Sequence, residues 1–162
     1  MSITTWIWAA PAVFLVHDAE EVLTVEPWLE VHRAELPAAL QRFAAETTEQ
    51  FALAVALLFV GFLAVAVHGA RQARRGRASL PFLLAAGALV ANGLTHLAQG
   101  AYFQAHTPGV ATALVLVLPY GYFLGARLLA TGLITRRTLG AALAAGVVAQ
   151  IPIAALALFV VH

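Results

Sequence analysis

Four apolar runs, each long enough to cross a membrane as a helix, constrain what this chain can fold into. They extend over about residues 51–70, 80–103, 110–133 and 139–161. A helix needs about 20 residues to span ~30 Å of hydrocarbon. The chain is 62% hydrophobic and 10% charged, whereas a soluble domain is about 45–50% apolar and about 25% charged. We therefore expect an all-α membrane protein rather than a soluble helical domain.

A fifth run is also long enough to span, although its C-terminal end is polar. It has no positive N-terminal region and no small-residue cleavage site, so it is not typical of a removable signal peptide. We therefore expect a single domain over residues 1–162, with five transmembrane helices in one bundle. The expected spans are about 4–24, 50–70, 80–105, 109–133 and 138–161.

Residues 25–49, between the first two spans, are too polar to cross the membrane. Their amphipathic spacing predicts a short helical segment lying in the outer interface. At its end, Thr47 followed by Gln50 predicts a capping box at the start of the second span.

The charged residues are distributed unevenly, and their positions predict the membrane topology. Residues 1–49 carry eight acids and two Arg, a net charge of −6, whereas residues 50–162 carry seven Arg and no acid, a net charge of +7. Six of those seven Arg lie in two short loops, around 71–77 and 136–137. Cytoplasmic loops are enriched in positive residues, so we expect the N-terminus inside and the C-terminus outside. The loops are too short, and too poor in aromatic residues, for nucleic acid binding.

Small residues in the spans predict close helix packing. Gly121 and Gly125 are spaced as in motifs that let helix backbones approach each other. Packing within one bundle is the expected use, and self-association into a homo-oligomer is the alternative.

A polar cluster interrupts the first span. His17, Asp18, Glu20 and Glu21 fall within five residues of an otherwise apolar segment. A charged group at the centre of a membrane helix costs about 2.5–3.5 kcal/mol on insertion scales, and such groups usually face the protein interior and have a function. His17, Glu20 and Glu21 are spaced i, i+3 and i+4, so they share one side of the helix. Asp18 is expected to point elsewhere, toward the outer interface.

A second polar stripe lies in the span expected over residues 80–105. Asn92, His96 and Gln99 are spaced i, i+4 and i+7 and share one helix face. At ~1.5 Å per residue, His17 and His96 both lie roughly 10 Å inside the outer boundary. We therefore expect a shared site in the outer half of the bilayer, made of His17, Glu20, Glu21, Asn92 and His96.

Two kinds of chemistry suit these residues. Imidazoles and carboxylates bind divalent metals such as Zn²⁺ or Fe²⁺, and the candidate ligands are His17, Glu20, Glu21 and His96. Without a metal, the same groups and Asn92 could act in acid–base catalysis. The simpler interpretations are a hydrogen-bonded core histidine at His96, an interhelical hydrogen bond at Asn92, and a polar helix end at His17. The chain has no Cys and no Lys, which excludes thiolate and Schiff-base chemistry.

The string His17-Asp-Ala-Glu20-Glu21 has the form H-x-x-E-E, and it is followed by Glu26-x-Trp28. Together with Asn92-x-x-x-His96, and with Pro108-Gly109-Val110 and Pro119-Tyr120 downstream, it gives the chain a pattern that resembles the HXXEE family. The resemblance covers nearly the whole chain. It implies a small bacterial integral membrane protein of uncharacterised function, located in the inner membrane, with His17, Glu20, Glu21 and His96 as the residues carried over. His106 does not look like part of the family pattern.

Three functional hypotheses follow. The first is an enzyme acting on a membrane lipid or isoprenoid-like molecule, by metal-assisted hydrolysis or by acid–base isomerisation or cyclisation. The second is a small proton-coupled transporter or channel that uses the same cluster as a relay. The third is a non-catalytic protein that binds a metal or a lipid.

Overall fold

The computed structural model of the chain is an all-helical bundle, and it describes residues 1–36 and 47–161. Five long helices and several short helical segments follow one another along the chain, with no strand in the described residues. The elements are α1 (Ile3–His32), η1 (Arg33–Glu35), α3 (Thr48–Arg74), α4 (Leu80–Phe103), α5 (Val110–Thr112), η3 (Ala113–Val117), α6 (Leu118–Ala130) and α7 (Arg136–Val161). Segments α5, η3 and α6 follow one another without a gap, and the middle one is a single π-helical stretch.

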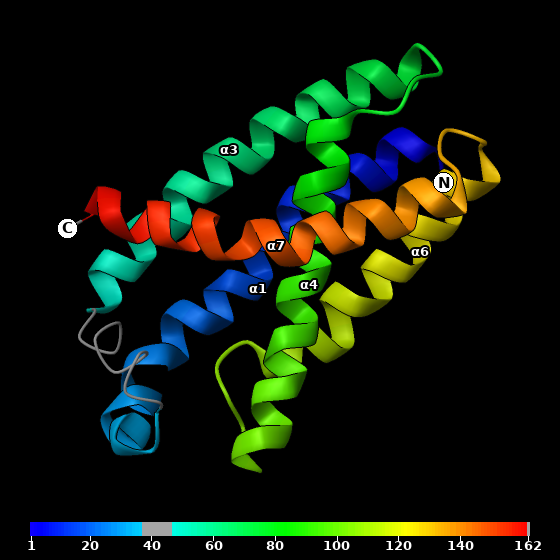
Figure 1. Cartoon of the computed structure of the whole chain (residues 1–162). Helices are drawn as coiled ribbons and strands as arrows, with labels where there is room; N and C mark the ends of the chain where they lie inside the picture. The colour runs from blue at the N-terminus through cyan, green and yellow to red at the C-terminus, as the bar shows by residue number, and fades with distance from the viewer. Residues whose placement is uncertain (37–46, 162) are drawn as a thin grey trace.

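The first helix is longer than the sequence predicts. We expected a span over residues 4–24 followed by a separate interfacial helix, but α1 continues to His32. Its 30 residues would measure about 45 Å, more than the ~30 Å of bilayer hydrocarbon. Pro27 lies inside α1, and the last turns run in a different direction from the rest of the helix (Figure 1), as expected where proline removes a backbone hydrogen bond. The remainder of the expected interfacial segment, residues 37–46, lies outside the described residues.

Three stretches of the described chain are long and apolar enough to cross a membrane: α3, α4 and residues 110–130. Large apolar side chains on α3 are strongly exposed, including Leu53 at 53% and Val60 at 65%. Contiguous exposed apolar surface of this kind suits lipid rather than water. The capping box at the start of α3 is confirmed, because Thr47 and Gln50 each bond the other's backbone.

Close backbone contacts hold the bundle together. Helix α7 crosses α4 in Figure 1, and the crossing is built on Gly87 and Gly146. A Cβ on Gly146 would lie 2.3 Å from the backbone carbon of Gly87, so any larger residue would force the helices apart. A Cβ on Gly121 would lie 2.4 Å from Cγ2 of Val90 on α4, which supports packing within the bundle for this glycine.

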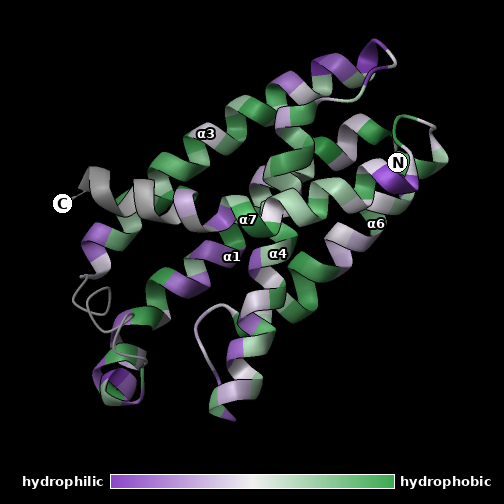
Figure 2. Ribbon diagram, viewed as in Figure 1, coloured by the Kyte–Doolittle hydropathy of each residue, from purple (hydrophilic) through white to green (hydrophobic). Residues whose placement is uncertain are grey.

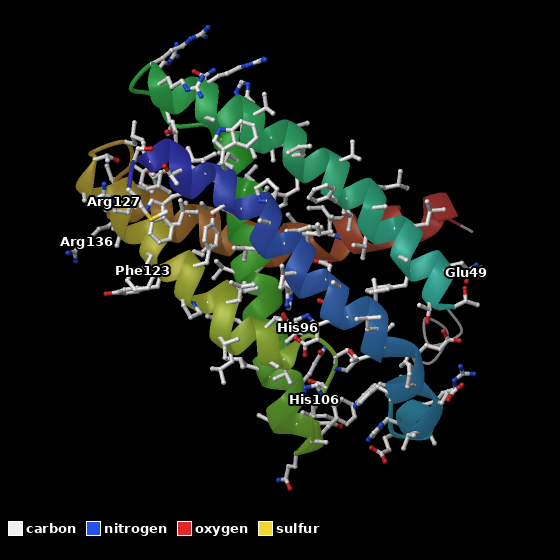
Figure 3. The ribbon with its side chains drawn as sticks, turned by 180° about the vertical axis from the view of Figure 1, so that it is seen from behind. Glu49, His96, His106, Phe123, Arg127 and Arg136 are labelled. Carbon is white, nitrogen blue, oxygen red and sulfur yellow. The ribbon has the colours of Figure 1, made fainter. Side chains whose placement is uncertain are left out.

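The basic residues gather at one end of the bundle. Figure 2 shows hydrophilic residues at the turn between α3 and α4 and at the start of α7, and both lie at the end that carries the N-terminus (Figure 1). Arg127 donates a hydrogen bond to the carbonyl of Met1 at 2.8 Å. In Figure 3, Arg127 and Arg136 lie far from Glu49, which is at the opposite end. The labelled arginines and Glu49 therefore lie at opposite ends of the bundle.

Candidate functional site

Three potential ligand atoms from two helices converge inside the bundle. Glu21 Oε1 lies 3.2 Å from His17 Nε2 and 2.8 Å from His96 Nε2. The two imidazole rings meet edge to face, with centroids 5.0 Å apart. All three ligand atoms lie within 4.8 Å of one another. The prediction that His17 and His96 lie at the same level in the bundle is therefore confirmed.

Asn92 completes the contacts around Glu21. Its Nδ2 lies 3.2 Å from Glu21 Oε1, 3.2 Å from His17 Nε2 and 3.1 Å from His96 Nε2. Among the described residues, the polar partners of Glu21 are these three side chains, and none carries a fixed positive charge. The carboxylate therefore relies on a proton or on a bound cation for charge balance, since an unpaired charge in a dry interior is costly.

The site is enclosed. His17 is 0% exposed and His96 is 7% exposed, whereas the Glu21 side chain is 13% exposed. The Nδ1 of His96 is buried without a well-formed hydrogen bond, although the backbone of Pro108 interacts with that ring. Figure 3 shows His96 close to α1, inside the bundle.

The turn before α5 covers the site, and Gly109 makes this possible. Its φ of +76° is in the left-handed region, which glycine adopts without strain. A Cβ there would lie 2.9 Å from His96 Cε1, 3.0 Å from Glu21 Cγ and 3.1 Å from His17 Cε1. The backbone of Gly109 therefore closes over the three converging side chains at a distance that excludes any larger residue.

Thr112 orients His17. Its Oγ1 lies 2.5 Å from Glu20 Oε2 and 2.7 Å from His17 Nδ1. A carboxylate only accepts hydrogen bonds, so the single hydroxyl hydrogen goes to Glu20 and the hydroxyl oxygen accepts from His17 Nδ1. In the neutral ring the proton is then on Nδ1, and the lone pair of Nε2 faces Glu21 and Asn92. Metal-binding histidines are commonly oriented in this way by a partner on the other ring nitrogen.

Glu20 has a different place from the one we expected. We took it as a candidate metal ligand, but it does not join His17, Glu21 and His96. Its carboxylate accepts from the backbone N–H of Thr112 at 2.7 Å and of Ala111 at 3.2 Å, where the N-terminus of a helix favours an anion. His106 Nε2, on an exposed side chain, lies 3.6 Å from Glu20 Oε1. Glu20 therefore acts on the site through Thr112.

A largely apolar cavity of about 420 Å³ borders the site. Glu21 and Asn92 form part of its wall, so the cavity reaches the candidate site at these two side chains. Most of the wall comes from apolar residues of four helices: Phe14 on α1; Phe51, Ala54, Val55, Leu57, Leu58, Phe62 and Val65 on α3; Ala85, Ala88 and Leu89 on α4; and Ile153 on α7.

The sequence expectation for Asp18 was wrong. Asp18 does not point to the outer interface: it is only 6% exposed and lines the cavity. Helix α3 packs against the face of α1 that carries Asp18, and the exposed positions of this turn, such as Val16 and Ala19, lie on another face. Gln99, which shares a helix face with Asn92 and His96 but was not expected in the site, is exposed near the end of α4.

Sequence reasoning identified His17, Glu21, Asn92 and His96 but did not find two further residues. Thr112 gave no signal, since a single threonine in an apolar run is common. Gly109 was visible in Pro108-Gly109-Val110, a sequence typical of a tight turn, but its position over the site depends on the fold. The assignment of any of these residues to catalysis or to metal binding stays a prediction.

Comparison with known proteins gives a family but no activity. No curated protein and no solved structure matches the chain. The family model described as a protein of unknown function with HXXEE motif matches residues 8–124. That range includes most of α1, all of α3 and α4, and the segment with Gly109 and Thr112, and therefore every residue of the candidate site. The chain belongs to the HXXEE family.

Proposed function

We propose that this protein is an integral membrane enzyme that binds one divalent cation, Zn²⁺ or Fe²⁺, and acts on a lipophilic substrate. The cation ligands are His17, Glu21 and His96. The observation that carries the proposal is the convergence of their ligand atoms beside an apolar cavity.

The geometry of the three ligand atoms suits a metal ion. Ligands about 2.0–2.1 Å from a tetrahedral ion lie about 3.3 Å from one another, and the observed separations from Glu21 Oε1 are 3.2 and 2.8 Å. The tautomer set by Thr112 directs the His17 lone pair toward Glu21. A cation between these atoms relieves the repulsion of the two lone pairs and balances the carboxylate.

Three protein ligands leave a coordination position for water or substrate, as in catalytic rather than structural zinc sites. A divalent cation held there would supply Lewis acidity, lowering the pKa of water so that hydroxide is available to attack a carbonyl or phosphoryl centre. Metal-assisted hydrolysis is therefore the reaction class that the ligand set favours. If no metal is bound, the same His and Glu side chains suit acid–base isomerisation.

The position of the cavity supports a lipophilic substrate. Its exposed lining residues include Leu57 on α3, at 45%, and Ile153 on α7, at 40%. The exposed part of the cavity wall therefore includes residues of α3 and α7, whose outer surfaces face hydrocarbon if both helices span. Lateral access of this kind suits a lipid or isoprenoid-like molecule better than an ion that must cross the bundle, which is why an enzyme is preferred to a transporter.

The membrane arrangement is part of the proposal. Helices α1 and α7 serve as the first and fifth spans, together with α3, α4 and residues 110–130. The N-terminus and the two basic turns are cytoplasmic, because positive residues favour that side. The His and Glu site then lies in the outer half of the bilayer.

Metal analysis of the purified protein tests the cation. Wild-type protein in detergent should contain about one Zn or Fe per chain, and Glu21→Gln should lose it. The matched control is Glu30→Gln, on the same helix but exposed, which should retain the metal. Protein without bound metal, and without any uptake on addition of Zn²⁺ or Fe²⁺, would contradict the metal proposal.

Conversion of a lipid tests the enzyme. Metal-loaded wild-type protein and Glu21→Gln are incubated with total membrane lipid in nanodiscs, and the lipids are compared by mass spectrometry. We expect one lipid class to fall and a product to rise with wild type and Glu30→Gln, but not with Glu21→Gln. Retained metal with no lipid changed would overturn the enzyme proposal in favour of a non-catalytic binding protein.

A further inference from the structure

The cavity wall contains two buried acceptor atoms that nothing in the described structure satisfies. One is Oδ2 of Asp18 on α1, and the other is Oε1 of Gln150 on α7. Both residues line the cavity. Buried polar atoms are almost always hydrogen-bonded, because an unmet buried acceptor destabilises the folded protein. Two such atoms on the wall of one cavity indicate a ligand that donates hydrogen bonds.

The orientation of Gln150 follows from its neighbours. Thr95 Oγ1 donates to the carbonyl of Ala91 at 3.0 Å, so its only hydrogen is used. Its oxygen therefore accepts from Gln150 Nε2, at 3.0 Å. The amide is thus fixed with nitrogen toward Thr95, and Oε1 is left as the free acceptor.

The charge on the cavity wall identifies the kind of donor. Asp18 and Glu21 are both carboxylates, and no Arg or His is among the described residues that line the cavity. Glu21 lies against His17, His96 and Asn92, with which it forms the proposed cation site, so Oδ2 of Asp18 is the carboxylate oxygen on the wall without a partner. A positively charged N–H donor would satisfy Asp18 more strongly than a neutral hydroxyl, because charge-assisted hydrogen bonds are about twice as strong.

We infer that the cavity binds a long-chain amine, with its ammonium group between Asp18 and Gln150 and its hydrocarbon chain among the apolar side chains of α3 and α4. The apolar wall, with Phe14, Leu58 and Phe62 among its residues, suits an alkyl or isoprenoid chain. The inference builds on the proposed function, since it assigns a headgroup to the lipophilic substrate. It uses Asp18, which is not one of the three proposed metal ligands.

Saturable binding of dodecylamine to protein in nanodiscs tests the inference. Empty nanodiscs measure partitioning into lipid, and dodecanol of the same chain length measures the contribution of the charge. We expect wild type to bind dodecylamine at least 10-fold more tightly than dodecanol. Asp18→Asn should lose most of that preference, Gln150→Leu part of it, and the exposed control Glu30→Gln none.

The metal content of each variant separates this inference from the proposed function. Asp18→Asn should keep its Zn or Fe, which also shows that the variant is folded. Equal dodecylamine binding by wild type and a metal-loaded Asp18→Asn would overturn the inference, as would wild type that binds metal but shows no saturable amine binding. If the protein proves to bind no metal, we still expect wild type to bind dodecylamine and Asp18→Asn to bind it more weakly.

Discussion

His17 and Thr112, which are 95 residues apart in the sequence, are joined through Nδ1 and Oγ1 at 2.7 Å. The same hydroxyl donates a hydrogen bond to the carboxylate of Glu20, which is also on α1. The contact ties the turn that covers the site to the helix that carries two of the three converging side chains. It also places Nε2 of His17 toward Glu21, so Thr112 sets the tautomer of the neutral His17 ring without touching Glu21.

Thr112→Val should weaken metal binding about 10–100-fold, the usual effect of losing the group that orients a metal-binding histidine. The valine keeps the shape of threonine but cannot accept from His17. Thr24→Val is the matched control, because the Thr24 hydroxyl bonds only the carbonyl of Glu20 in its own helix. Titration of metal-free protein with Zn²⁺ measures both. Equal affinities would show that Thr112 does not orient a ligand.

Glu21→Gln should destabilise a metal-bound protein. The change removes the charged ligand, and a loss of about 2 kcal/mol lowers the melting temperature by about 4–8 °C in a chain of this size. Chelator should lower the melting temperature of wild type but not of the variant. If the variant is instead more stable and chelator has no effect on either protein, the site holds a costly buried acid and no metal.

Gly109→Ala should cost more stability than Gly132→Ala, although both positions have a positive φ, +76° and +68°. Alanine in the left-handed region costs about 1–2 kcal/mol at either position. Only at Gly109 does the new methyl group also meet the His96 and His17 rings, whereas a Cβ on Gly132 has nothing within 4 Å. Unfolding midpoints and metal content measure the difference. Similar stability and metal content in the two variants would mean that the turn does not close over the site.

Acid should destabilise the contact between α1 and the start of α3. Glu26 accepts from the backbone N–H and the hydroxyl of Thr48, and these hydrogen bonds hold the pKa of Glu26 below its usual value. The resulting stabilisation is present above the unfolded pKa of about 4.3 and is lost as pH falls through the lower folded value. Thr48→Val should therefore be less stable than wild type at neutral pH. It should also lose less stability than wild type as the pH falls from about 5 to about 3. If the unfolding midpoints of wild type and Thr48→Val fall equally with acid, the contact between Glu26 and Thr48 does not contribute to acid sensitivity.

Single cysteines test the topology against a zero background, since the chain has no Cys. Ala78→Cys, exposed beside the basic turn after α3, should be shielded from an impermeant thiol reagent in intact cells. Glu35→Cys, exposed after α1, should be labelled. The reverse labelling pattern would invert the proposed orientation.

Much of the helical architecture follows from local sequence. Apolar runs of more than 20 residues predict long helices, and the Thr47 and Gln50 pair predicts where α3 begins, because capping depends on residues close in sequence. The end of α1 was missed because a proline bends a helix without ending it when packing supports the next turns. The common level of His17 and His96 was also predictable, because helix rise converts residue number into depth.

The sequence by itself determined that this chain is helical, that its helices are apolar enough for a membrane, and that His17, Glu21 and His96 could meet. Only the tertiary structure decided what surrounds them. Glu20 bonds the start of α5, Thr112 orients His17, Gly109 closes the site and Asp18 lines the cavity. These relationships depend on the turn before α5 folding back over α1 and on α3 packing beside Asp18. Helix periodicity sets the direction of a side chain along its own helix, but it carries no information about which distant segment lies opposite.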